Sequence, residues 1–244
     1  MGSGFPLDGD TDSCREGLAA LRDADAWNRI RRALDDAAAA QLAATPDIAV
    51  PEEIVVLLVL GDPGDAHFMS PAMGMVANGS VTGHIVVVLW PSPENLARLE
   101  ATVAHELHHN LRYTPGNVVW NPATVTVGEQ VVSEGLADAF ARRLHGDELG
   151  YSRLAVANLG DDAVFDKVVG GLGVTGMQNF AAWVHGDAIA ARFGATPVGL
   201  PTGAGYSVGN RLVDAYLAAT GRDVTEALLV DSSEVIATAL AART

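Results

Sequence analysis

A pair of histidines inside one expected helix constrains this chain most. The segment from Ser92 to about Tyr113 is expected to be helical, because Ser92 can cap the first turn and Pro93 suits its first position. Within this helix, His105 and His109 are four residues apart, so both imidazole rings lie on one face, one turn from each other. Two neighbouring imidazoles can reach a single metal ion. The helix therefore has to present this face to a site and not to the core.

Glu106 completes the pattern His-Glu-x-x-His. Beside a metal-binding pair, its carboxylate can hold a water molecule and accept a proton from it, while zinc lowers the pKa of that water. His108 offers a second pairing with His105, but that pairing removes Glu106 from its usual place, so we prefer His105 with His109. The opposite face of the helix is apolar and is expected to lie against the core, through Leu96, Leu99, Val103, Leu107 and Leu111.

The next helix, expected from about Thr126 to Leu144, supplies a candidate third ligand. Glu134 and Asp138 are one turn apart and apolar residues flank both, so this helix is expected to be largely buried. Ionised carboxylates are costly to bury without compensation. Glu134 as a metal ligand, and Asp138 as hydrogen-bond acceptor for a metal-binding histidine, would compensate both. The alternative is an amphipathic helix whose carboxylates face water. Glu129 lies at the helix start, where a carboxylate caps the helix or interacts with its dipole.

The remaining pattern indicates an α+β fold, with a loose polar lead-in at 1–23 and a single domain over 24–244. The N-terminal half is expected to contain a helix at 24–44 and two strands, Ile54–Leu60 and His84–Trp90. The second strand directly precedes the histidine helix; at the edge of a sheet it would pair with an extended peptide. The C-terminal half is expected to be mostly helical, with helices near 161–171, 176–184, 206–219, 224–230 and 233–242.

Charge and cysteine content exclude several classes of partner. The chain has 15 Lys and Arg against 30 Asp and Glu, a net charge of −15. That charge repels nucleic-acid phosphates and anionic lipids, so we expect neither nucleic acid nor membrane as a partner. The longest apolar run, Ile54–Leu60, is far shorter than the about 20 residues that cross a bilayer. Cys14 is the only cysteine, so no internal disulfide can form, and we expect a reducing, cytoplasmic location.

The two motifs together resemble a known family. The runs Ala104–Arg112 and Val132–Ala141 contain His-Glu-x-x-His and Glu-Gly-Leu-Ala-Asp. They are similar to the gluzincins and, more closely, to the bacterial family of predicted Zn-dependent proteases called domain of unknown function 2268. A third segment, Gly205–Asn210, resembles a Gly-Tyr-x-x-Gly segment that opens a late helix in that family. The resemblance covers about residues 50–240.

The resemblance implies a zincin-like fold. Such a fold has a small N-terminal sheet, an active-site helix with the two histidines, and a mostly helical C-terminal part. The resemblance also implies zinc, with His105, His109 and Glu134 as its ligands and with Asp138 orienting one of the two histidines.

Two residues are candidates for hydrogen bonding to the oxyanion of a hydrolytic intermediate. Tyr206 is the first candidate, because it follows a Gly-rich stretch and matches the family segment; His185 is the second. We therefore expect a zinc-dependent hydrolase, most simply a metallopeptidase with Glu106 as general base. One alternative is a zinc hydrolase acting on a small non-peptide amide or a biosynthetic intermediate. Another is a non-catalytic, metal-stabilised binding protein, against which the presence of Glu106 argues.

Overall fold

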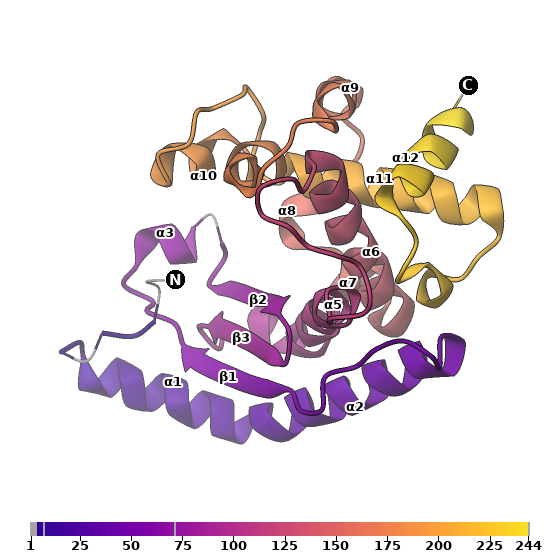
Figure 1. The fold of residues 1–244 in the computed structure, drawn as a ribbon. Coiled ribbons are helices and arrows are strands. Elements are labelled where there is room, and N and C mark those ends of the chain that lie inside the picture. The colour runs from indigo at the N-terminus through magenta and orange to yellow at the C-terminus, as the bar shows by residue number, and fades with distance from the viewer. Residues whose placement is uncertain (1–3, 7, 71, 244) are drawn as a thin grey trace. The chain divides into compact units, whose positions relative to one another are not determined.

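The computed structural model describes residues 4–6, 8–70 and 72–243. Over these residues the chain is a mixed α+β protein with one small sheet near the N-terminus, as predicted, and is otherwise mostly helical (Figure 1). Internal contacts divide the chain into two compact units, residues 1–115 and 116–244. The single domain expected from the sequence stays a prediction.

The first unit contains a three-stranded sheet with the order β1-β3-β2. Both predicted strands are present, as β1 (Val55–Leu60) and β3 (His84–Leu89), and they run parallel. The sequence analysis missed β2 (Met75–Val81), which runs antiparallel to β3, because Asn, Gly and Ser disfavour a strand. The expectation that β3 lies at the edge is wrong. Both sides of β3 are hydrogen-bonded to other strands, which leaves β1 and β2 at the edges of the sheet.

The first unit also contains a helix where the sequence analysis expected a loose lead-in. This helix, α1 (Thr11–Asp23), forms because the Asp10 carboxylate accepts a hydrogen bond from the backbone N–H of Asp12 and because Leu21 is buried on its inner face. The other helices of this unit are α2 (Ala26–Ala44), α3 (Ala66–Met69), α4 (Pro93–Ala97) and α5 (Leu99–Arg112).

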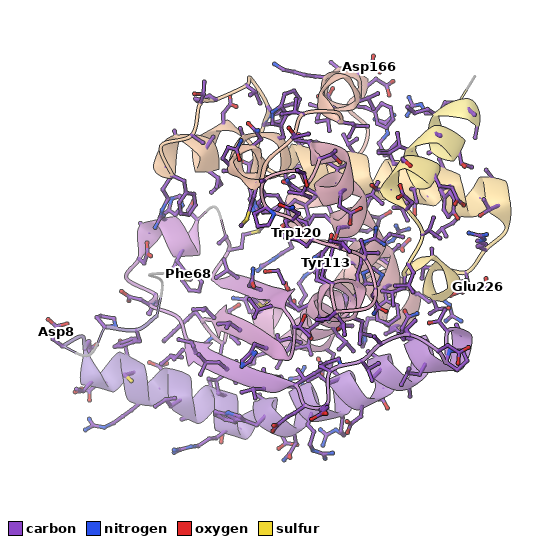
Figure 2. The ribbon with its side chains drawn as sticks, in the orientation of Figure 1. Asp8, Phe68, Tyr113, Trp120, Asp166 and Glu226 are labelled. Atoms are coloured by element: carbon purple, nitrogen blue, oxygen red, sulfur yellow. The ribbon has the colours of Figure 1, made fainter. Side chains whose placement is uncertain are left out.

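A short helix, α4, and a longer one, α5, replace the single helix expected from Ser92 to Tyr113. Ser92 caps α4 as predicted, since its hydroxyl oxygen accepts from the Asn95 backbone N–H at 3.2 Å. Arg98 leaves the helical conformation and separates α4 from α5. The apolar face of α2 packs on α5, and the ring of Phe68, labelled in Figure 2, is buried against Gly61. The contacts of α5 with α2, β2 and β3 fix it against the core of its unit.

The second unit consists of helices around α6 (Val127–His145), which agrees with the helix expected at 126–144. Its other helices are α7 (Asp147–Gly150), α8 (Arg153–Val156), α9 (Asp162–Gly171), the 3₁₀-helix η1 (Met177–Asn179), the π-helix η2 (Ala181–His185), α10 (Asp187–Arg192), α11 (Ala204–Thr220), the 3₁₀-helix η3 (Val224–Ala227) and α12 (Ser232–Ala241). The sequence analysis missed α7, α8 and α10, which are one or two turns long. Within the described residues, no helix is both long and apolar enough to cross a membrane.

Candidate metal centre and active site

The histidines of α5 converge on one point. The Nε2 atoms of His105 and His109 are 3.0 Å apart, and their rings meet edge to face with centroids 4.8 Å apart. Two nitrogens that each bind one tetrahedral zinc at about 2.0–2.1 Å would be about 3.3 Å apart. The spacing of the two rings therefore suits a shared metal ion, as their four-residue separation predicts.

The neighbours of this pair in α5 are buried. His108 is fully buried, and its ring centroid is 6.5 Å from that of His109. Glu106 is also buried, with only 8% of its surface exposed. Its backbone lies against β2, where Gly79 leaves no room for a side chain, because a Cβ there would overlap the carbonyl oxygen of Glu106. The candidate base is therefore set on a helix whose backbone is fixed at that residue.

The candidate third ligand lies on a helix that is buried on every side. In α6 each residue from Val127 to Ala141 is buried, including Glu134 at 7% and Asp138 at 0% exposure. The expected burial of both carboxylates is confirmed. At its start, the Thr126 hydroxyl accepts from the Glu129 backbone N–H at 3.0 Å, so Thr126 is the cap and Glu129 occupies the first turn.

Asp138 is held by two donors from its own unit. Its Oδ2 accepts 2.7 Å from Asn210 Nδ2 on α11 and 3.1 Å from the Ser152 backbone N–H. Two glycines bring these helices together, since a Cβ on Gly135 would overlap the backbone carbonyl of Gly209. The close crossing of α6 and α11, followed in Figure 1, lets the short Asn210 side chain reach the carboxylate.

The two oxyanion candidates lie together in the second unit. The His185 ring, at the end of the π-helix η2, is 5.6 Å from the Tyr206 ring and meets the Phe180 ring edge to face at 4.8 Å. Burial lowers the pKa of His185, and the negative charge of Glu134 partly opposes that change. His185 thus lies within electrostatic reach of Glu134 and favours the neutral imidazole. π-Helical turns are rare and frequently occur at functional sites.

One group of potential metal ligands is present among the described residues. One nitrogen each from His105 and His109 and one carboxylate oxygen from Glu134 all lie within 4.8 Å of one another. His108 does not belong to this group. Two imidazoles and one carboxylate form a donor set of catalytic zinc, which leaves a fourth position for water or substrate. The residues present therefore fit a zinc ion, and zinc suits nitrogen and oxygen donors of this kind.

Sequence reasoning missed three polar residues of α5, α6 and α11: Asn110, Gln130 and Asn210. Each is buried in the structure. Asn210 ends the Gly-Tyr-Ser-Val-Gly-Asn segment, so the family resemblance of that segment could have indicated Asn210. Its partner Asp138 is 72 residues away, and nothing in the segment indicates that contact. Asn110 directly follows His109 and contacts residues 26–31 positions earlier in the chain, which no local pattern reveals.

These features define a candidate metal centre of the histidine–histidine–glutamate class, and comparisons with known proteins agree with it. The chain belongs to the family described as predicted Zn-dependent protease (DUF2268), whose model matches residues 26–237. The resemblance inferred from the motifs is thereby confirmed.

One relative of the chain is the uncharacterized protein YjfC of Bacillus subtilis (strain 168). The two are 32% identical over 188 residues, which cover 76% of this chain and 60% of the relative. The chain thus spans less than two thirds of the length of that relative. No solved structure matches the chain.

Proposed function

We propose that this chain is a zinc-dependent metallopeptidase whose metal is held by His105, His109 and Glu134. The observation that carries the proposal is the group formed by their three ligand atoms. Membership of a family of predicted Zn-dependent proteases supports a peptide as substrate. Zinc bound at these residues lowers the pKa of a water molecule and polarises the carbonyl of a substrate.

In this proposal Glu106 is the general base. Its carboxylate accepts a proton from the attacking water while the water oxygen forms a bond to the carbonyl carbon. When the carbon–nitrogen bond breaks, Glu106 donates the same proton to the leaving amine nitrogen. Two observations support this role: Glu106 directly follows His105 in the sequence, and it is buried. In a site with little solvent, the base does not lose its proton to bulk water.

Tyr206 and His185 are proposed to stabilise the negative charge on the substrate oxygen. The Tyr206 hydroxyl can donate a hydrogen bond to that oxygen, and the neutral His185 ring can donate from one nitrogen. Their neighbouring rings, and the electrostatic influence of Glu134 on His185, support a place near the metal ligand. We propose Tyr206 as the main donor to the substrate oxygen. Its hydroxyl can always donate a hydrogen bond, whereas His185 can donate only from the ring nitrogen that carries the proton.

Asp138 is proposed to orient one metal-binding histidine. Its Oδ2 is engaged by Asn210 and by Ser152, so we assign the bond to the imidazole N–H to the other oxygen, Oδ1. Such a bond fixes the tautomer and the direction of a metal-binding imidazole.

The strand that pairs with an extended peptide is proposed to be β2 (Met75–Val81) instead of β3. It is an edge strand of the sheet, and through Gly79 it touches the backbone of Glu106. A peptide added along this edge would gain main-chain hydrogen bonds close to the proposed base.

The test combines metal analysis with a peptide-library assay on the full chain. Purified wild type should contain one zinc and cleave peptides, with loss of activity in a chelator and recovery on zinc addition. Glu106→Gln should keep zinc and lose activity, whereas alanine at His105, His109 or Glu134 should lose zinc. His67→Ala, a histidine change in α3 outside the ligand group, is the control and should retain both.

Two results would refute parts of the proposal. Full activity of Glu106→Gln would exclude the proposed base. Zinc-dependent cleavage of small amides, with no cleavage of any peptide, would assign the same site to a small-molecule hydrolase.

A further inference from the structure

The side chain of Asn110 ties the histidine helix to the hairpin of β2 and β3. Asn110 follows His109 in α5 and is fully buried. Its Nδ2 donates to three carbonyl oxygens of the hairpin, and its Oδ1 accepts from one backbone N–H at 2.9 Å. The three carbonyls belong to Gly79 at 2.9 Å, Val81 at 2.8 Å and His84 at 3.1 Å, and the N–H belongs to Gly83.

These four contacts lie where the pairing of the strands is irregular. The register of β2 against β3 shifts between Asn78 and Val81. At such a bulge the ladder leaves backbone groups unpaired and the strand bends. Buried backbone groups need partners, and here the amide of Asn110 supplies them, with two N–H groups shared among three carbonyls. The shape of the bulge therefore depends on one side chain of the helix that carries the metal-binding histidines.

The same stretch of β2 rests on the backbone of the proposed base. Gly79 accepts from Asn110 through its carbonyl, and a Cβ at Gly79 would overlap the Glu106 carbonyl oxygen. The strand is thus attached to α5 at two neighbouring points. The Asn110 bonds hold it in place, and the missing Cβ of Gly79 sets how close it lies to Glu106.

We propose that Asn110 is a positioning residue that sets the free edge of β2 at a fixed place relative to the Glu106 carboxylate. This inference rests on the proposed function, because it assigns β2 to the binding of an extended peptide. A peptide paired along β2 would then present its scissile carbonyl to Glu106 only while the bulge keeps its shape. Asn110 itself touches neither substrate nor metal in this proposal.

The chain offers a matched control in Asn95. This residue is also fully buried, and its Nδ2 donates to the carbonyls of Gly74 at 3.0 Å and Trp90 at 2.8 Å. These acceptors flank the other end of the same hairpin, next to the start of β2 and the end of β3. Asn95→Asp and Asn110→Asp therefore remove the same kind of bond from opposite ends of one hairpin.

The experiment compares zinc-loaded wild type, Asn110→Asp and Asn95→Asp with two substrates that share one scissile bond. One substrate is a dipeptide derivative and the other is extended by several residues on both sides. In Asn110→Asp we expect kcat/KM for the extended peptide to fall about 10- to 100-fold, because displacing a bound substrate by an ångström has effects of this size. The short substrate should change little, and zinc content should stay the same. Asn95→Asp should keep the wild-type ratio between the two substrates.

Two further measurements test the inference, and the first of them remains available if Asn110→Asp fails to fold. Gly79→Ala pushes β2 from Glu106 without touching Asn110, and it should reduce the same ratio of long to short substrate. Backbone amide exchange of the full chain should become faster at 79–84 in Asn110→Asp and not in Asn95→Asp.

An equal loss of the substrate ratio in Asn95→Asp would overturn the inference. So would unchanged amide exchange at 79–84 in Asn110→Asp. If wild type cleaves no peptide, the proposed function fails, whereas the amide-exchange comparison still decides whether Asn110 holds the bulge.

Discussion

Gln130 makes a clear stability prediction, because it is a buried amide that the fold does not use. It lies in α6, one turn before Glu134, and is 1% exposed. Neither its Oε1 nor its Nε2 has a hydrogen-bond partner among the described residues. Leaving such a group unsatisfied costs about 1–3 kcal/mol. The change Gln130→Met keeps the length of the side chain and removes this cost.

We expect Gln130→Met to raise the free energy of unfolding by about 1–3 kcal/mol. For a chain of 244 residues, each kcal/mol shifts Tm by about 2–4 °C, so the expected rise is roughly 2–12 °C. Calorimetry of the zinc-loaded protein measures the shift. Gln178→Met is the control, because Gln178 is exposed and its amide stays in contact with water. That variant should change the free energy of unfolding by less than about 0.5 kcal/mol.

A lower Tm for Gln130→Met would refute the reasoning, since it would mean that the amide contributes to folding. A higher Tm together with reduced peptide cleavage would show that the Gln130 amide serves activity at a cost in stability. Such a trade-off between stability and activity is common in active sites. Zinc content, which should not change, separates that result from a loss of metal.

Two more substitutions test the second unit. Asp138→Asn should weaken zinc binding about 10- to 100-fold in a competition titration, because an amide is a poorer acceptor for a metal-binding imidazole; unchanged affinity would remove Asp138 from the centre. Gly135→Ala should lower the free energy of unfolding by about 1–3 kcal/mol, since its Cβ would force α6 away from Gly209 and detach Asn210 from Asp138. The control is Gly170→Ala, at an exposed helical glycine where an added Cβ would meet open space. This change should raise the free energy of unfolding by about 0.5–1 kcal/mol. Equal thermal shifts in the two variants would contradict the packing argument.

The sequence predicts the parts of the fold that follow local periodicity. The helix of His105 and His109, the buried helix of Glu134, and both apolar strands follow from spacing and burial patterns, because these patterns extend over one element. It also predicts that Glu134 and Asp138 are buried, since apolar residues surround both along α6.

The missed parts of the sheet depend on contacts between distant residues and have weak local signals. The strand β2 has a polar, Gly-containing sequence and is held by β3 and by Asn110. The central place of β3 follows only from the existence of β2. The helix α1 is a different case, because its signals are local: Asp10 caps the first turn, and Cys14, Leu18 and Leu21 recur at helical spacing. The strand β2 and the central place of β3 cannot be read from a single segment.

A common device positions candidate residues within each unit. In the first unit, Asn110 bonds to a strand that approaches closely because Gly79 has no side chain. In the second, Asn210 bonds to Asp138 across two helices that meet at Gly135. An asparagine side chain is short, so it reaches such a partner only when the two backbones are in contact, and only glycine allows that contact. The asparagine and the glycine therefore depend on each other. A methyl group on either glycine should disturb the same hydrogen bonds as loss of the asparagine, although Gly79 takes part in them only through its backbone carbonyl and Gly135 takes no part.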